Sequence, residues 1–245
     1  MTSRRKAGRY APTPLALLAL LAITAGCSKD KDVEQPAELV DFEPTLSVDR
    51  LWSASAGGGG GAMRAGLAPA IDNERIYAAG RGGDVLALQA ADGRTAWRVR
   101  TKTELTGGPG IGAGLVVVGS LDGEVIALSA EDGRERWRVK LGGEVLSAPA
   151  VSAEIVVVRT VDGRLHGLSP AEGKSLWREE QAVPRLTLRG AATPVIAGNV
   201  VICGFDNGRA IAIDVRNGEL LWDALLAPAR GRTELERMVD IDSAV

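Results

Sequence analysis

The chain has 245 residues, of which 45% are hydrophobic and 24% are charged, and its formal net charge at pH 7 is −2. This composition is ordinary for a soluble protein and supplies enough apolar side chains for a sizeable core. No long basic run follows the N-terminus, so charge gives no support to a nucleic-acid partner. The 31 glycines make the chain rich in turns, which favours many short strands over long helices.

The N-terminus has the pattern of a secretory signal. Four basic residues within the first nine precede a short apolar run from Leu15 to Ala25, and small residues follow. A membrane-spanning helix needs about 20 apolar residues, and this run is much shorter. We therefore expect residues 1–26 to be a signal peptide.

The signal ends in Ala25-Gly26-Cys27, which resembles a bacterial lipobox, although Thr24 stands where lipoboxes usually carry Leu. The resemblance implies that Cys27 is lipidated, becomes the mature N-terminus and anchors the chain in the lipid of the outer membrane. Plain secretion and a signal anchor are the alternatives. Residues 27–46 would then tether the lipid to the folded domain, since they are charged and contain prolines.

One frame of residues occurs four times. Each copy has a Trp, one Gly four positions before it, a second Gly fourteen positions before it and a Pro 28 positions before it. The four copies contain Trp97, Gly93, Gly83 and Pro69; Trp137, Gly133, Gly123 and Pro109; Trp177, Gly173, Gly163 and Pro149; and Trp222, Gly218, Gly208 and Pro194. Three fixed offsets in four copies indicate a repeat protein.

Each copy predicts four short strands. In the second copy Leu115–Val118 is a β-branched run, Glu124–Leu128 alternates polar with apolar side chains, and Arg134–Val139 carries the Trp. The remaining strand is expected in the connection that precedes each copy, around Val145–Val151 for the third. A four-stranded unit of about 40 residues is typical of a propeller blade, whereas a helical solenoid needs 3.6-residue apolar stripes that are absent. The Trp ring is expected to fill the gap between neighbouring blades.

The predicted fold is therefore an all-β, partial β-propeller over residues 47–245. Complete repeats are expected at about 62–101, 102–141, 142–181 and 187–226, and a fifth begins at 237–245. Trp52, which precedes the first complete repeat, reads as the outer strand of a blade whose other strands are absent.

The stretch Ala212–Trp222 resembles the tryptophan-docking repeat of quinoprotein dehydrogenases and their non-catalytic relatives, which implies PQQ-like blades over residues 62–226. Members that are enzymes need a calcium site beside the quinone, an Asp base and often two adjacent cysteines. This chain has no adjacent cysteines, and its single His166 aligns with Leu86, Ile126 and Ile211, which suggests a structural place in a strand. The other cysteine, Cys203, is expected to be a small buried hydrophobe. We expect no catalytic residue, cofactor or metal; a truncated PQQ-dependent dehydrogenase is the alternative.

The spacing of the repeat breaks at two connections. The interval from Trp to the Pro of the next copy is twelve residues after Trp97 and Trp137 but seventeen after Trp177; after Trp222 no Pro stands at either interval, since Pro228 comes only six residues later. Equivalent connections lie on the same face of a propeller, so residues 178–193 and 223–244 are expected to be adjacent. Insertions gathered on one face are a usual way for a repeat scaffold to build a binding surface.

The two long connections carry a closer resemblance. Leu186-Thr187-Leu188-Arg189-Gly190 in the first, and Thr233–Arg237 with Asp240-Ile241-Asp242 in the second, resemble the BamB family of outer-membrane propeller lipoproteins. In that family the Leu-x-Leu-Arg and Asp-x-Asp motifs bind the periplasmic (POTRA) domains of BamA, the central component of the β-barrel assembly machinery. The resemblance implies partner-binding roles for Leu186, Leu188, Arg189, Asp240 and Asp242.

The same resemblance implies a non-enzymatic scaffold on the periplasmic side of the outer membrane, within the assembly complex, that helps unfolded outer-membrane proteins to fold and insert. Two alternatives stay open: the leucines only pack between blades while Asp240 and Asp242 cap a turn, or a propeller lipoprotein has another partner. A family member closes eight blades, so the chain is expected to be a fragment or a truncated reading frame. An open arc of this kind is expected to have unpaired edges and to associate.

Overall fold

The computed structural model describes residues 38–40, 45–57, 66–72, 74–184, 186–187, 192–239 and 241. The chain divides into two compact units, Met1–Asp49 and Arg50–Val245. The described residues of the first unit are exposed and form no strand; the second unit carries every strand of the described chain. The signal peptide 1–26 and Cys27 lie outside the described residues, and no described helix is long and apolar enough to cross a membrane.

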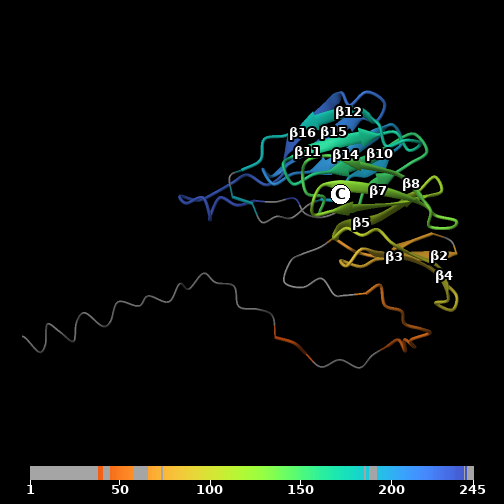
Figure 1. The fold of residues 1–245 in the computed structure, drawn as a ribbon. Coiled ribbons are helices and arrows are strands. Elements are labelled where there is room, and N and C mark those ends of the chain that lie inside the picture. Colours follow the sequence, from red (N-terminus) through yellow and green to blue (C-terminus); the bar gives the residue numbers. More distant parts are fainter. Residues whose placement is uncertain are drawn as a thin grey trace, which may run out of the picture. The chain divides into compact units, whose positions relative to one another are not determined.

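The described part of the second unit forms four antiparallel sheets of four strands and no helix (Figure 1). The first blade has β1 (Ala70–Ile71), β2 (Arg75–Ala79), β3 (Asp84–Gln89) and β4 (Thr95–Arg100). The second has β5 (Leu105–Gly112), β6 (Leu115–Ser120), β7 (Glu124–Ser129) and β8 (Glu135–Lys140). The third has β9 (Ala150–Val151), β10 (Val156–Arg159), β11 (Arg164–Leu168) and β12 (Ser175–Glu180). The fourth has β13 (Val195–Ala197), β14 (Val200–Gly204), β15 (Arg209–Asp214) and β16 (Leu220–Leu225). Since neighbours in each sheet are consecutive along the chain, every blade is an antiparallel meander, as the repeat predicts.

The strands agree with the predicted ones in number and order, but the expected alternation in Glu124–Leu128 is wrong. Every residue of β7 from Val125 to Ser129 is buried. The reason is that an inner strand of a blade has another blade packed on each of its faces, so neither face meets water. The strand that precedes β10 is also shorter than the predicted Val145–Val151, since β9 covers only Ala150–Val151.

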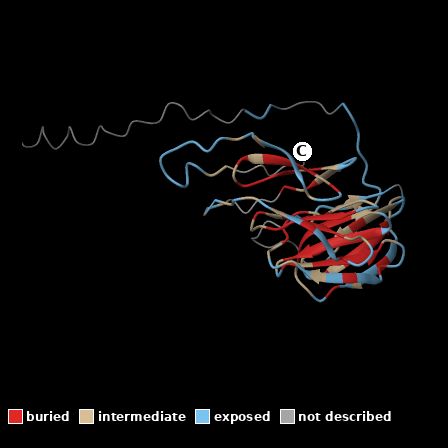
Figure 2. Cartoon of the chain, turned by 90° about the horizontal axis from the view of Figure 1, so that it is seen from above, coloured by how far each residue is buried: buried red, intermediate tan, exposed pale blue. Residues whose placement is uncertain are grey.

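The core lies between blades rather than within one. One buried cluster fills each junction between neighbouring blades. The first junction includes Tyr77 and Ile126, the second Val125 and Val158, and the third Leu165 and Ile211. Figure 2 shows the buried residues along the stacked strands and the exposed ones in the turns and connections. Each blade is therefore stabilised mainly by its neighbours, as expected of a repeat architecture.

Four of the five Trp residues dock on the following blade: Trp52, which precedes the frame, and Trp97, Trp137 and Trp177 within it. Each indole Nε1 donates a hydrogen bond to a backbone carbonyl of that blade. The pairs are Trp52 to Ala90 (3.0 Å), Trp97 to Ala130 (3.0 Å), Trp137 to Pro170 (2.7 Å) and Trp177 to Val215 (2.7 Å). The fifth, Trp222, has a 44% exposed side chain because no described blade covers it, and it leaves an apolar edge on β16.

The Gly four positions before each Trp receives the ring of the preceding Trp. A Cβ added to Gly173 would lie 2.6 Å from the ring of Trp137, and one added to Gly133 would lie 2.7 Å from the ring of Trp97. Both glycines also have φ near +70°, at +69° and +74°, a region that favours glycine. The frame thus links a Trp in one blade to a Gly in the next.

Candidate partner-binding face

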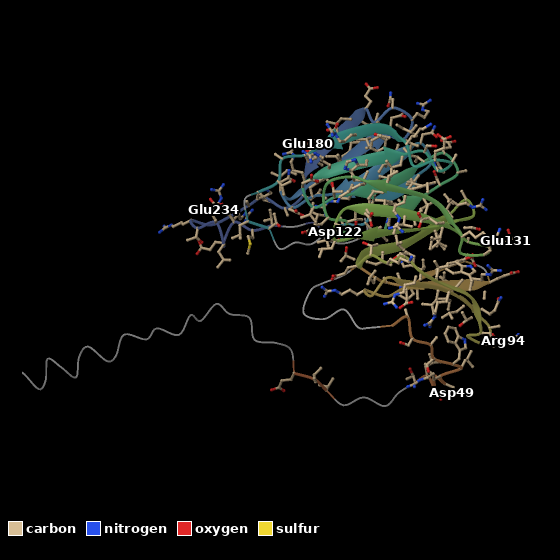
Figure 3. All side chains as sticks on the ribbon, viewed as in Figure 1. Asp49, Arg94, Asp122, Glu131, Glu180 and Glu234 are labelled. Carbon is tan, nitrogen blue, oxygen red and sulfur yellow. The ribbon has the colours of Figure 1, made fainter. Side chains whose placement is uncertain are left out.

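The connections between blades and the β2–β3 turns, with their equivalents in the other blades, lie at one end of the strands, which we call the connection face. Asp122 in the β6–β7 turn, Glu180 at the end of β12 and Glu234 in the last connection lie toward this end in Figure 3. Arg94 and Glu131, in the hairpin turns that precede β4 and β8, lie toward the opposite end. This division follows from the antiparallel meander, in which successive turns alternate between the two ends.

The two short connections are fixed to the turns beside them by backbone hydrogen bonds. In the connection between the first and second blades, Leu105 N donates to Arg81 O (3.1 Å) and Glu104 O accepts from Leu121 N (3.2 Å). In the next connection Val161 N donates to Glu144 O, which is the equivalent of the second bond, while Val145 N donates to Ser120 O, one residue earlier in the turn than the equivalent of Arg81. Both short connections are therefore held against the neighbouring turns by backbone hydrogen bonds.

The first long connection begins like the others and then departs from them. Its first residue bonds as in every other copy, with Gln181 N donating to Gly163 O (2.9 Å). The next carbonyl, of Ala182, accepts a hydrogen bond from the side chain of Asn207 in the β14–β15 turn (3.0 Å). Among the predicted partner-binding residues of this connection, Leu186 is 43% exposed, whereas Leu188 and Arg189 lie outside the described residues.

The second long connection contains a turn that is held by its own side chains. The carboxylate of Glu236 accepts from the backbone N–H of Arg232 (2.8 Å) and of Thr233 (3.1 Å), while Glu236 N donates to Thr233 Oγ1 (3.2 Å). This reciprocal arrangement has the pattern of a capping box, and its backbone hydrogen bonds lower the pKa of Glu236. Thr233–Arg237, one of the stretches that carry the family resemblance, therefore forms a defined, exposed loop.

After this loop the chain returns to the fourth blade. A Cβ added to Gly204 would lie 2.4 Å from Ile241 Cγ2, and one added to Gly208 would lie 3.1 Å from Val239 Cγ2, so the absence of side chains at both glycines makes room for this return. The predicted contact residues Asp240 and Asp242 lie outside the described residues. The two long connections both contact the β14–β15 turn, Phe205–Gly208, as their equivalent places in the repeat predict.

A buried ion pair lies beneath this turn and was missed in the sequence. Arg159, the last residue of β10, donates from Nη2 to Asp206 Oδ1 at 2.7 Å, and both side chains are almost fully buried. The guanidinium also lies 5.1 Å from the centre of the Phe205 ring, within cation–π range. The available signal was a departure from the repeat, since the residues equivalent to Arg159 are Ala79, Gly119 and Gly204.

The single His and the second Cys have the structural places that were expected. His166 is buried in β11, and desolvation lowers its pKa to about 4. Burial raises the pKa of the Cys203 thiol to about 12, so this residue behaves as a small hydrophobe in β14. Within the described residues no three His, Cys, Asp or Glu side chains gather as ligands for a metal ion.

Comparison with known proteins decides the family. The family described as "Outer membrane protein assembly factor BamB" matches residues 81–245 of the chain. The chain belongs to the BamB family. Its relatives in that family include the assembly factor of Pseudomonas aeruginosa, 57% identical over 94% of this chain, and that of Xanthomonas campestris pv. campestris, 42% identical over 94%. The chain spans about three fifths of the length of these relatives, 61% and 62% respectively.

Solved structures agree on the fold. The crystal structure of BamB from Moraxella catarrhalis has a TM-score of 0.69 and 30% identity, covering 74% of this chain and 55% of that one. A quinohemoprotein alcohol dehydrogenase from Pseudomonas putida has a TM-score of 0.52 and 18% identity, covering 64% of this chain and 33% of that one, which shows a shared fold alone. The predicted all-β propeller with PQQ-like blades is therefore confirmed, as is membership of the BamB family.

Proposed function

We propose that the chain is a non-enzymatic scaffold of outer-membrane protein assembly, attached to the outer membrane through lipidated Cys27 and facing the periplasm. In this proposal it binds the periplasmic POTRA domains of BamA and, through them, the rest of the assembly complex, and it assists unfolded outer-membrane proteins. The observation that carries the proposal is that the two long connections of a BamB-family chain both contact one turn of the fourth blade.

The proposed contact residues suit a protein interface. Leu186 is an apolar side chain with 43% of its surface exposed, and the sequence places Leu188 and Arg189 beside it. Leucines next to an Arg provide an apolar anchor and a directional charge, a combination found at interface hot spots. The carboxylates of Asp240 and Asp242 would orient that Arg or accept hydrogen bonds from the edge of a partner strand.

An enzymatic role has weaker support. The likeness to quinohemoprotein dehydrogenases is one of fold at 18% identity, whereas relatives at 57% and 42% identity are named assembly factors. The one His is a poor general base, since it is buried and its low pKa, about 4, makes it a weak proton acceptor at neutral pH. The proposal is accordingly one of binding and positioning.

The test is a binding measurement between the full chain and the purified periplasmic domains of BamA. In a variant with Leu188→Ala and Arg189→Ala, we expect affinity to fall about 30-fold or more, because truncating hot-spot residues costs about 2 kcal/mol or more.

The matched control is Leu176→Ala with Arg134→Ala, which removes the same two residue types from exposed positions outside the long connections. The control should bind like the wild type. Unchanged binding in the Leu188 and Arg189 variant would refute the site, and no binding by the wild-type chain would refute the proposed partner.

A further inference from the structure

The β14–β15 turn differs from its three equivalents at the residues that touch the third blade. The turn reads Phe205-Asp206-Asn207-Gly208, whereas the others read Gly80-Arg81-Gly82-Gly83, Ser120-Leu121-Asp122-Gly123 and Thr160-Val161-Asp162-Gly163. Phe205 and Asp206 depart from all three equivalents, and both contact Arg159, which departs from its own equivalents. Three departures that meet in space indicate one built feature at the junction of the third and fourth blades.

Arg159 fills a place that connection residues fill elsewhere. A Cβ added to Gly119, its equivalent in the second blade, would lie 2.2 Å from Val145 of the following connection, and one added to Gly204 would lie 2.4 Å from Ile241. Val145 stands four positions before Pro149 of the next copy, and the residue four positions before Pro194, at the end of the first long connection, is Gly190. The large Arg159 is thus matched in sequence by a glycine in its connection, whereas the small Gly119 is matched by the larger Val145.

The buried pair fixes geometry more than it adds stability. Two charges that are almost fully removed from water cost desolvation energy, which their attraction repays only in a well-defined arrangement. Asp206 Oδ1 is held by Arg159, whereas Asp206 Oδ2 is buried and finds no hydrogen-bond donor within the described residues. Backbone hydrogen bonds close the turn, as in the other blades, and the bond from Arg159 adds a fixed position for the Asp206 side chain.

The same turn holds both long connections. Asn207 donates from Nδ2 to the carbonyl of Ala182 in the first (3.0 Å) and accepts from Arg209 N at Oδ1 (3.0 Å). Gly208 O accepts from Leu226 N (2.9 Å) and Ala227 N (3.0 Å) at the start of the second. The glycines of this region also admit the returning end of the second connection.

We propose that Arg159, Asp206 and Asn207 are positioning residues of the partner-binding face: the buried pair fixes the turn, and the turn holds the two long connections in the arrangement that a partner recognises. This inference rests on the proposed function for its consequence in binding. The holding of the connections is measurable without any partner.

The first experiment is hydrogen exchange on the full chain carrying Asn207→Asp. An Asp keeps the oxygen that accepts from Arg209 N, and it is the residue of two equivalent turns, Asp122 and Asp162, but it has no N–H to give to Ala182. We expect exchange of the amides at 181–187 to accelerate about fivefold, with the blades unaffected, because one hydrogen bond is lost. Unchanged exchange at 181–187 overturns the role of Asn207.

The control is Asn217→Asp in the hairpin at the other end of the fourth blade. Asn217 makes a similar local hydrogen bond, accepting from Glu219 N at 3.0 Å, and the substitution brings the same change of charge. It should leave exchange at 181–187 as in the wild type. Equal acceleration in both variants would assign the effect to charge and overturn the proposal.

The second experiment removes the buried pair. Arg159→Met with Asp206→Leu replaces both charges at once, so that no lone buried charge remains to unfold the chain. We expect exchange to accelerate about tenfold in 181–187 and 226–239, while β2–β8 exchange at the wild-type rate. Equal acceleration throughout the blades, or none in the connections, overturns the positioning role.

Binding to the periplasmic domains of BamA is then compared for the same variants. We expect about fivefold weaker binding for Asn207→Asp and wild-type binding for Asn217→Asp. Looser connections with unchanged affinity would overturn the link to the partner while leaving the Leu188 and Arg189 result intact. If instead the variant with Leu188→Ala and Arg189→Ala binds normally, the proposed binding site fails, whatever the exchange experiments show.

Discussion

The second and third blades are alike at one end and different at the other. Their outer strands β8 and β12 share one burial pattern in which only the Trp is buried, and both Trp137 and Trp177 are 7% exposed and donate a 2.7 Å hydrogen bond to the next blade. Toward the connection face, Gly119 and Ile126 of the second blade are replaced by Arg159 and His166 in the third.

The contrast shows which residues every blade needs for stacking and which residues are free to differ between blades. The Trp and its Gly repeat because every junction between blades has the same geometric problem, which is to cover a large ring and satisfy its N–H. The connection end varies because it is free of that requirement. The two blades should therefore respond equally to changes at the shared end and unequally at the other.

The largest expected effect comes from the shared Trp. Trp137→Ala and Trp177→Ala are each expected to lower the free energy of unfolding by about 3–5 kcal/mol, since each removes a buried aromatic ring. Trp222→Ala should cost less than about 1 kcal/mol because that side chain is 44% exposed. Urea unfolding of the full chain, followed by circular dichroism, measures all three. Unequal losses at Trp137 and Trp177 would break the equivalence of the two blades.

A smaller effect is expected from the glycine that receives the ring. Gly173→Ala should cost about 3 kcal/mol, because a Cβ would lie 2.6 Å from the Trp137 ring and the backbone has φ +69°. Gly142→Ala is the matched control: its φ is +90°, but nothing lies within 4 Å of an added Cβ, so only the backbone strain of about 1 kcal/mol remains. The two variants are compared by urea unfolding. Equal losses would show that the ring contact contributes nothing.

The frame was predictable from sequence because its offsets are fixed by blade geometry. The fold class, the docking of the Trp rings and the places of His166 and Cys203 followed from those offsets. The burial of β7 did not follow, because a short apolar run does not reveal that both of its faces are covered. The expectation that the two long connections are adjacent came from counting residues between Trp and Pro.

The Arg159–Asp206 pair was beyond this reasoning, although its residues depart from the repeat. Arg159 and Asp206 are separated by 47 residues, and nothing in their local sequence indicates that they meet. A charged residue in a strand also reads as solvent-exposed unless its partner across the blade junction is known. The predicted contact residues Leu188, Arg189, Asp240 and Asp242 remain predictions from the family resemblance, since they lie outside the described residues.

The smallest expected effect distinguishes the two blades by pH. Desolvation lowers the pKa of His166 to about 4, with Asp162 opposing this and Arg178 and Arg164 adding to it. The unfolded chain, with an ordinary pKa near 6.5, takes up the proton first as the pH falls. His166 therefore has no effect on the pH dependence of stability above about pH 6.5 and destabilises the fold progressively between about pH 6.5 and pH 4.

At pH 5 this loss should be about 2 kcal/mol relative to pH 7.5. His166→Leu places in the third blade the residue that the first has at Leu86, and it should remove that part of the acid sensitivity while leaving the shared Trp contacts unchanged. Urea unfolding of both proteins at pH 7.5 and pH 5 measures the difference. The second blade has Ile126 at this position and cannot contribute such an effect. A pH dependence of stability that persists undiminished in His166→Leu would therefore show that His166 is not the source of the acid sensitivity.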